Sequence, residues 1–247
     1  MSGITVVSNT DQLARAAADE LQSITREAVR DRGVCRIALS GGSTPKYLFQ
    51  QLVALGRDAL PWDSIDLWWG DERTVPPDHK DSNYGMAKQH LLDPLKIDPA
   101  RVHRMEGERD PEAAAADYER ALCAAAGIPP VLDYNLLGMG KDGHTASLFP
   151  GSPALTEMNR TQKTRWVIAN PIDSPLAGGK TTRITITFHT IAAARHTRLL
   201  VAGEDKADAL AGVLEGPPGR YPSQFVGGAD VRWIVDDAAA SKLRRRS

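Results

Sequence analysis

The sequence predicts an α/β fold with a mostly parallel sheet that is flanked by helices on both faces. The main observation is that short β-branched or apolar runs alternate with alanine- and leucine-rich amphipathic stretches along most of the 247 residues. This alternation is typical of strands joined by helices. Proline and glycine also punctuate the chain evenly, with no internal repeat or low-complexity linker. We therefore expect residues 1–247 to form a single domain.

Strands are expected at eight short runs that are rich in β-branched, leucine or aromatic residues and are bounded by turn-forming residues. In chain order, these runs are residues 5–7, 35–39, 65–69, 134–137, 166–169, 183–188, 198–201 and 231–235. Trp68 and Trp69 are neighbours on one such strand and therefore point to opposite faces of the sheet. We expect one to lie in the core and the other to pack under the elements that cover the sheet.

Helices are expected between these strands, where apolar residues recur at helical spacing. The clearest are residues 10–31, 45–55, 110–126 and 205–214. The first has a cap in Thr10 with Asp11 at its start, and the second has Pro45 in its first turn. A further helix should be capped by Ser82 or Asn83, and the last one precedes a Gly-Pro-Pro-Gly break at residues 216–219.

Composition indicates an ordinary cytoplasmic protein. The 30 lysines and arginines balance 31 acidic residues, so nothing suggests a nucleic acid or a membrane as partner, and the arginines at 244–246 read as a solvated tail. Cys35 and Cys123 lie in apolar surroundings without a second thiol or histidine at ligand spacing, which indicates reduced core residues and no metal site. No signal peptide and no apolar run of about 18 to 20 residues is present. We expect a monomer.

The segment 136–150, LLGMGKDGHTASLFP, contains the spacing G-x-G-x-x-G of a dinucleotide-binding loop. That motif requires a long helix after its third glycine, whereas Phe149 and the Pro-Gly-Ser-Pro that follows it stop any helix within a turn or two. What remains is Asp142-Gly143-His144 on a glycine-rich backbone. A histidine can take and return a proton while a nearby carboxylate orients it, although a solvated surface turn has the same residues.

Ligands of open parallel sheets bind beyond the carboxyl ends of the strands, and polar residues follow several of the predicted strands. Residues 40–45, SGGSTP, combine Gly41 and Gly42 with the hydroxyls of Ser43 and Thr44 before the helix start at Pro45. Free N–H groups at such a start favour an anion. The lysine of a triphosphate-binding loop is misplaced here, because Lys46 follows a proline. A Gly-Gly turn with an ordinary cap is the alternative.

Charged residues follow other strands in the same way. Asp71 and Arg73 come after residues 65–69. Asp71 is suited to hold a sugar hydroxyl or to move a proton, and Arg73 is suited to bind a phosphate. An ion pair between the two on a solvated loop is equally compatible with the sequence. Arg183 begins a strand, and Lys206 lies in the first turn of a helix, where a cation is unfavourable unless an anion shares that end. The other five histidines form no pair at metal-binding spacing, so we assign them no role.

Taken in order, these motifs closely resemble the 6-phosphogluconolactonase family over nearly the whole chain. The matching segments are residues 39–45 (LSGGSTP), 70–73 (GDER), 82–84 (SNY), 137–150 (LGMGKDGHTASLFP) and 183–188 (RITITF). The resemblance implies hydrolysis of 6-phospho-D-glucono-1,5-lactone to 6-phosphogluconate, in the oxidative pentose phosphate pathway. It also implies a Rossmann-like α/β fold that is shared with glucosamine-6-phosphate deaminases.

The resemblance also implies roles for individual residues. His144 corresponds to the general base that activates water, Asp142 would orient it, and no cofactor or metal is required. Backbone N–H groups near Gly41, Gly42 or Gly140 would stabilise the oxyanion. The remaining substrate-binding residues would grip the phosphate or meet sugar hydroxyls, and they are Ser43, Thr44, Asp71, Arg73, Asn83, Arg183 and Lys206.

Two alternatives share the fold. Deaminases have a glutamate five residues after the histidine, which works with it in sugar ring opening; this chain has Phe149 there, which favours lactone hydrolysis. The sugar-phosphate sensor domains of some transcriptional regulators would be preceded by a helix-turn-helix module, for which there is no room before the strand at Thr5, and the balanced charge does not fit a DNA-binding protein.

Overall fold

The computed structural model describes residues 3–157 and 164–244. Six strands form one parallel sheet in the order β1-β9-β8-β5-β2-β3. Their bounds are β1 (Gly3–Val7), β2 (Cys35–Leu39), β3 (Ile65–Trp69), β5 (Tyr134–Gly138), β8 (His196–Val201) and β9 (Val231–Asp236). Strands β2, β3, β5 and β8 are buried almost throughout, as expected where both faces of a parallel sheet are covered. The predicted α/β class is confirmed.

Three further strands form a separate antiparallel sheet in the order β4-β7-β6. They are β4 (Asp71–Arg73), β6 (Val167–Ser174) and β7 (Gly179–Ile186). Two of the eight predicted runs, 166–169 and 183–188, therefore do not join the parallel sheet. The second run also ends earlier than expected, because Phe188 begins a helix. A short connection through a turn at Pro175–Ala177 joins β6 to β7, and such a connection permits only an antiparallel pair.

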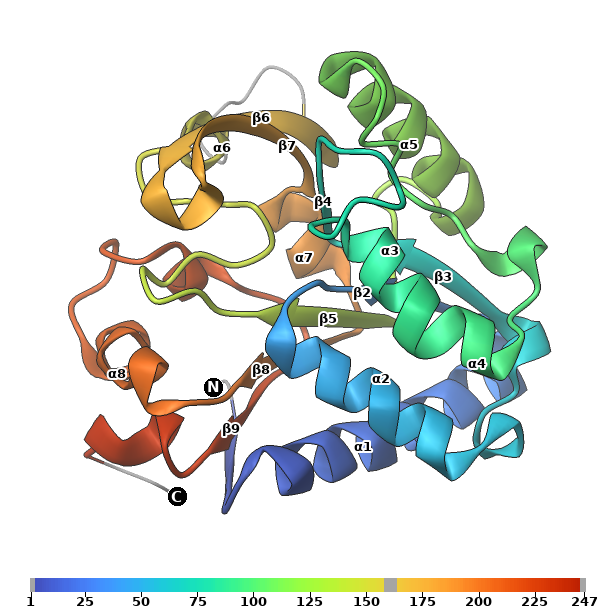
Figure 1. The fold of residues 1–247 in the computed structure, drawn as a ribbon, viewed down its shortest axis with the longest axis horizontal. Coiled ribbons are helices and arrows are strands. Elements are labelled where there is room, and N and C mark those ends of the chain that lie inside the picture. The colour runs from blue at the N-terminus through green and yellow to red at the C-terminus, as the bar shows by residue number, and fades with distance from the viewer. Residues whose placement is uncertain (1–2, 158–163, 245–247) are drawn as a thin grey trace.

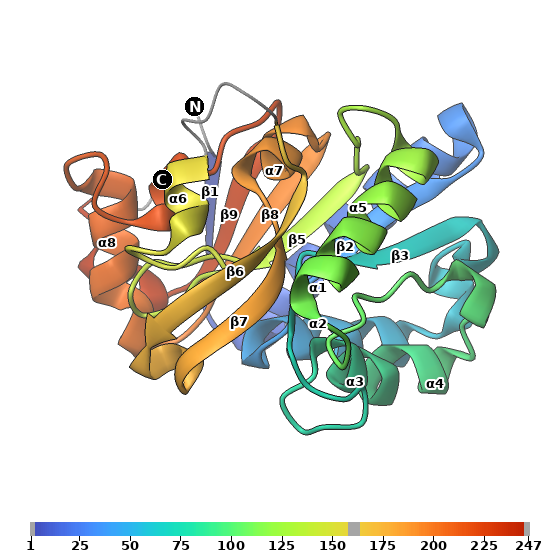
Figure 2. The same ribbon diagram turned by 90° about the horizontal axis from the view of Figure 1, so that it is seen from above.

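The helices cover both faces of the parallel sheet. They are α1 (Thr10–Arg32), α2 (Ser43–Leu55), α3 (Asn83–Ala87), α4 (Asp93–Leu95), α5 (Pro111–Ala126), α6 (Pro153–Glu157), α7 (Phe188–Ala193) and α8 (Ala207–Glu215). Figures 1 and 2 show α1 and α2 against one face, and α5, α7 and the small sheet on the other. Among the described residues, no helix combines the length and apolar character that crossing a membrane requires.

Three of the four predicted helices begin at another residue than expected, since α2 begins at Ser43 and not at Pro45, α5 at Pro111 and not at Asp110, and α8 two residues late. Helix α1 begins at Thr10 as predicted, but its cap differs. Asn9, not Thr10, caps α1, because its side chain accepts a hydrogen bond from Gln12 N at 3.0 Å. Helix α8 begins at Ala207, and Lys206 lies in the 3-10 turn just before it. Ser82 caps α3 as one of the two predicted residues, since its hydroxyl accepts from Gly85 N at 3.0 Å. The end of the basic run at 244–246 lies outside the described residues.

Candidate active site

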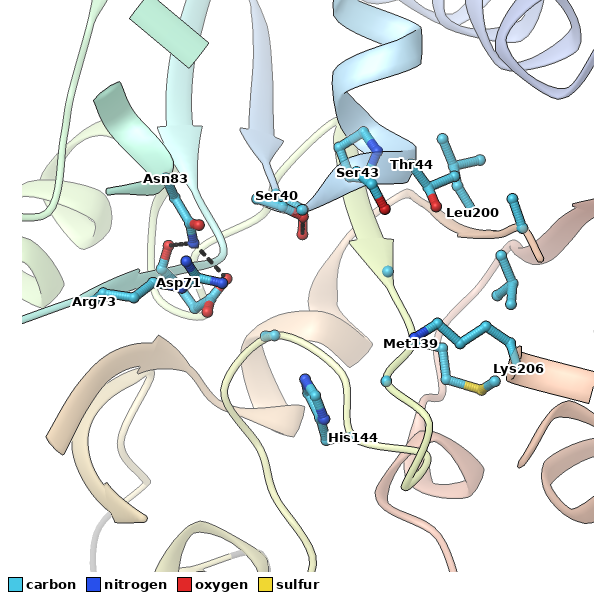
Figure 3. A pocket seen from close by; sticks show the side chains of 18 of the residues that line it. Ser40, Ser43, Thr44, Asp71, Arg73, Asn83, Met139, His144, Leu200 and Lys206 are labelled. Atoms are coloured by element: carbon cyan, nitrogen blue, oxygen red, sulfur yellow. Dashed lines mark hydrogen bonds between the residues drawn. The ribbon is translucent and has the colours of Figure 1, made fainter. Parts of the chain in front are cut away.

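A cavity of about 190 Å³ lies at the carboxyl ends of β2, β3, β5 and β8 (Figure 3). The chain passes from β2 to the edge strand β3 and then back across to β5, so the connections leave β2 and β5 in opposite directions and open a crevice between them. Eleven of the twelve predicted site residues line the cavity, namely Gly41, Gly42, Ser43, Thr44, Asp71, Arg73, Asn83, Gly140, His144, Arg183 and Lys206. The twelfth, Asp142, lies behind His144.

His144 is held by a tight turn that follows β5. The turn is closed by hydrogen bonds from Gly140 N to His144 O at 2.8 Å and from Gly143 N to Gly140 O at 3.0 Å. Asp142 Oδ1 lies 2.6 Å from His144 Nδ1 and also accepts the backbone N–H of His144 at 3.1 Å. Burial raises the pKa of Asp142, but its hydrogen bonds and charge interaction with His144 outweigh this, and the pKa lies below its ordinary value. The ionised carboxylate therefore faces Nδ1, which leaves Nε2 as the ring nitrogen free for chemistry.

Gly140 is required by this turn for a reason that the sequence did not reveal. A Cβ atom at Gly140 would lie 2.2 Å from two atoms of the His144 ring. Gly41 has a similar constraint, because a Cβ there would lie 1.7 Å from Asn83 Oδ1. Both glycines line the cavity, but they also make room for polar side chains of the site, and not only for a ligand.

Phe149 packs directly on the histidine. Its ring is stacked on that of His144, with centroids 3.9 Å apart and an interplanar angle of 15°. The guanidinium carbon of Arg183 lies 5.3 Å from the centre of the same Phe149 ring. Phe149 is fully buried, so the position where a deaminase would have an acid is occupied by an apolar group that contacts both site residues.

The start of α2 leaves backbone donors without a side-chain cap. Gly42 is the N-cap residue with φ 99°, and no side chain accepts from the first turn. Ser43 and Thr44, which were expected before the helix start, belong to its first turn and do not cap it. Their position in the first turn directs their backbone N–H groups out of the helix start and toward the cavity, which they line. An anion at this end would satisfy them.

Three cations border the same space. Arg73 donates to Asp81 O at 2.6 Å, and Arg183 donates to Ser147 Oγ at 3.5 Å. Within residues 3–157 and 164–244, neither arginine forms a salt bridge with a carboxylate. Burial lowers the pKa of Arg183, which is 8% exposed. The charge of Lys206, unlike that of the two arginines, has a carboxylate partner, because its Nζ lies 3.6 Å from the Asp205 carboxylate.

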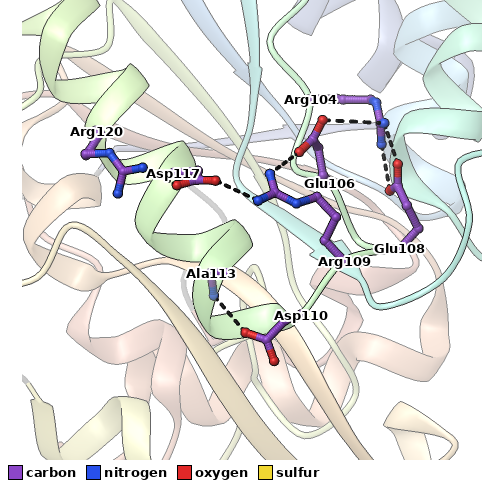
Figure 4. Close-up of polar contacts among 8 residues, drawn as sticks. All are labelled: Arg104, Glu106, Glu108, Arg109, Asp110, Ala113, Asp117 and Arg120. Carbon is purple, nitrogen blue, oxygen red and sulfur yellow. Dashed lines mark hydrogen bonds and ion pairs between the residues drawn. The ribbon is translucent and has the colours of Figure 1, made fainter.

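The segment that precedes α5 packs against the backbone of Arg73. Gly107 lies so close to it that a Cβ atom would be 2.1 Å from the Arg73 carbonyl oxygen. Figure 4 shows the ion pairs of this segment, in which Arg104 binds Glu108 at 2.5 Å and Arg109 binds an aspartate of α5 at 2.8 Å. These ion pairs hold together the segment that packs against the Arg73 backbone.

Asp71 and Asn83 lie side by side at the end of β3. Asn83 Nδ2 donates to the backbone oxygen of Asp71 at 2.9 Å and to its Oδ1 at 3.2 Å. The neighbouring Glu72 is buried and accepts from the backbone N–H groups of Arg73, Asn83 and Tyr84 at 2.7–2.8 Å. Burial raises the pKa of Glu72, and the three N–H groups oppose that rise. Glu72 therefore folds this loop around its carboxylate.

Several cavity residues were not predicted. Ser40, Gly138, Met139, Ala146 and residues 200–202 complete the lining. Except for Ala146, these residues lie at or directly after the carboxyl ends of β2, β5 and β8, which was a usable signal. Ala146, with φ 47°, had none, because no sequence pattern marks an alanine in the left-handed region. In the described part of the chain, no three His, Cys, Asp or Glu side chains are grouped to hold a metal ion.

Comparison with known proteins gives one consistent family. The family model of glucosamine-6-phosphate isomerases/6-phosphogluconolactonase matches residues 8–234. A 6-phosphogluconolactonase of Synechocystis sp. is 42% identical over 226 residues, which cover 88% of each chain. One from Streptomyces coelicolor is 40% identical over 248 residues, which cover 94% of this chain and 91% of the relative.

Comparison with solved structures indicates the same family. The 6-phosphogluconolactonase from Trypanosoma cruzi has a TM-score of 0.84 and 32% identity, covering 99% of this chain and 98% of that one. The Trypanosoma brucei 6-phosphogluconolactonase has a TM-score of 0.82 and 30% identity, covering 98% and 99%. A monomeric glucosamine-6-phosphate deaminase has a TM-score of 0.81 with 97% and 99% covered, but only 21% identity, which shows a common fold alone.

Proposed function

The chain belongs to the glucosamine-6-phosphate isomerase/6-phosphogluconolactonase family, and we propose that it hydrolyses 6-phospho-D-glucono-1,5-lactone to 6-phosphogluconate in the oxidative pentose phosphate pathway. The observation that supports this most is the pair of His144 and Asp142 at a cavity bordered by arginines without carboxylate partners. A base opposite an anion site is what hydrolysis of a phosphorylated lactone requires.

In the proposed reaction, His144 Nε2 takes a proton from water as the water oxygen bonds to the lactone carbonyl carbon. Asp142 holds Nδ1 and stabilises the imidazolium that forms. Backbone N–H groups at the glycine loop or at Gly140 stabilise the oxyanion. Collapse of the tetrahedral intermediate breaks the bond to the ring oxygen, which takes the proton back from the imidazolium. The products are the open-chain acid and a neutral His144.

Two sets of cavity residues would orient the substrate, one at its phosphate and one at its sugar hydroxyls. The phosphate would bind the free N–H groups at the start of α2 and the cations that border the cavity, which are Arg73, Arg183 and Lys206. Asp71 and Asn83 lie in position for sugar hydroxyls at the same cavity. That the enzyme is a monomeric, single-domain cytoplasmic protein without a cofactor stays a prediction from the sequence.

A coupled assay tests the proposal directly. Freshly prepared 6-phosphogluconolactone and, in parallel, glucosamine 6-phosphate are given to the wild type and to His144→Ala, with the spontaneous rate subtracted. We expect turnover of the lactone alone, a fall of about 10²-fold or more in kcat for the variant, and nearly unchanged binding of 6-phosphogluconate. Turnover of the amino sugar would indicate a deaminase, and binding without turnover of either would indicate a sensor domain.

A further inference from the structure

Ser147 is a buried residue of the histidine loop for which neither the motifs nor the proposed reaction gives a role. Ser147 follows the left-handed Ala146 and is fully buried behind residues that line the cavity. Its backbone is fixed independently of its hydroxyl, since Ser147 N donates to Thr185 Oγ1 at 3.2 Å and Ser147 O accepts from Asn170 Nδ2 at 2.8 Å. The hydroxyl is therefore free to serve another purpose.

That hydroxyl lies between two cavity residues of opposite charge. Ser147 Oγ donates to Asp71 Oδ2 at 2.6 Å and accepts from the Arg183 guanidinium at 3.5 Å. Asn83 occupies the other carboxylate oxygen, Oδ1, at 3.2 Å. Both oxygens of Asp71 thus have uncharged donors. Within the described residues, Asp71 and Arg183 form no direct ion pair, although Arg183 is nearly buried.

A nearly buried arginine would ordinarily pair with a carboxylate, because leaving its charge without a partner costs free energy. Here its direct contacts are a hydroxyl and the ring of Phe149, while Asp71, Asp81 and Glu72 act on its charge only from beyond ion-pair distance within the described residues. We propose that Ser147 is a positioning residue that keeps Asp71 from pairing with Arg183, so that the guanidinium stays available to the phosphate of the substrate. This rests on the proposed function for the identity of the ligand.

The consequence of losing the hydroxyl follows from the geometry. In Ser147→Ala, Asp71 Oδ2 loses its donor, and the guanidinium that contacted the same hydroxyl can supply one. We expect Arg183 to turn toward Asp71 and leave the phosphate site. Because a charge-assisted contact to the phosphate is then lost, the Kd for a phosphorylated ligand should rise about tenfold or more.

The experiment is calorimetric titration of wild type, Ser147→Ala and Ser152→Ala with 6-phosphogluconate, gluconate and inorganic phosphate. Ser152 is a matched control, since it is also buried in this loop but bonds Phe149 O and Asn170. We expect the Kd for 6-phosphogluconate and for inorganic phosphate to rise only in Ser147→Ala. The Kd for gluconate and the kcat for the lactone should change less than about threefold.

A double-mutant cycle with Asp71→Asn separates this role from a merely structural one. Without its charge, residue 71 no longer attracts the Arg183 guanidinium, so the effect of Ser147→Ala on phosphate affinity should shrink to less than about twofold. An unchanged phosphate Kd in Ser147→Ala, or the same loss with and without Asp71→Asn, would overturn the inference. Failure of the wild type to hydrolyse the lactone, with the cycle behaving as expected, would instead count against the proposed function alone.

Discussion

Asp142→Asn isolates the charge of the carboxylate that faces His144. The amide has nearly the same shape, so its oxygen can still accept from Nδ1 and from the backbone N–H, as Asp142 does at 2.6 and 3.1 Å. A hydrogen bond to a charged group contributes about 1.5–3 kcal/mol, against about 0.5–1.5 kcal/mol for a neutral one. The variant should therefore lose about 1–1.5 kcal/mol of stabilisation of the imidazolium, which forms only during the reaction. The expected result is a fall in kcat of about tenfold, with KM nearly unchanged.

The assay is the steady-state rate with the phosphorylated lactone across pH, corrected for spontaneous hydrolysis. Asp142→Ala should lose at least as much kcat, because it also loses the group that selects the tautomer. A variant with full kcat would refute the view that Asp142 acts through His144.

Three further predictions concern other parts of the molecule. Arg73→Ala and Lys206→Ala should each raise KM for the phosphorylated lactone about tenfold or more and leave unphosphorylated gluconolactone nearly unaffected; equal effects on both would contradict a phosphate site. Gly140→Ala should abolish most turnover without unfolding the chain, because its Cβ would lie 2.2 Å from the His144 ring; kcat and circular dichroism together test this. Arg198→Ala removes a guanidinium that is 2% exposed and bridges Glu20 and Asp230, whose side chains are 27% and 26% exposed. Because Asp230 keeps His196 and Arg232 as partners, unfolding in urea should reveal a loss of about 1.5–3 kcal/mol, and no measurable loss would contradict a stabilising role for this network.

The sequence predicted the parallel sheet well because its strands are short apolar runs between clear helices. It did not predict that the runs near 166–169 and 183–188 would form a separate sheet. Strand periodicity is the same in both sheets, and only the short turn between β6 and β7 distinguishes them. Helix starts were less certain, since Asn9 and Thr10 are both residue types that cap helices; asparagine is the more favoured of the two, and it is the cap in the structure.

The candidate site was predictable wherever polar residues followed a strand. All the predicted residues come together around one cavity, with Asp142 one contact behind it. What the sequence could not supply were contacts between segments far apart in the chain. The bridge of Ser147 to Asp71 is of this kind, since it joins residues 76 positions apart. The stacking of Phe149 on His144 is local, but it depends on the exact path of a turn that the sequence does not specify.

The cavity draws its walls from segments that run from Ser40 to Lys206, so no local stretch of the chain can form it. A ligand held there contacts the ends of four strands together and binds only the completely folded molecule. Its binding energy therefore adds to the stability of the whole fold, by about 2.7 kcal/mol at a hundred times Kd. Substrate and product concentrations would then set how often the protein opens to proteases, which makes its lifetime a readout of the metabolite that it handles.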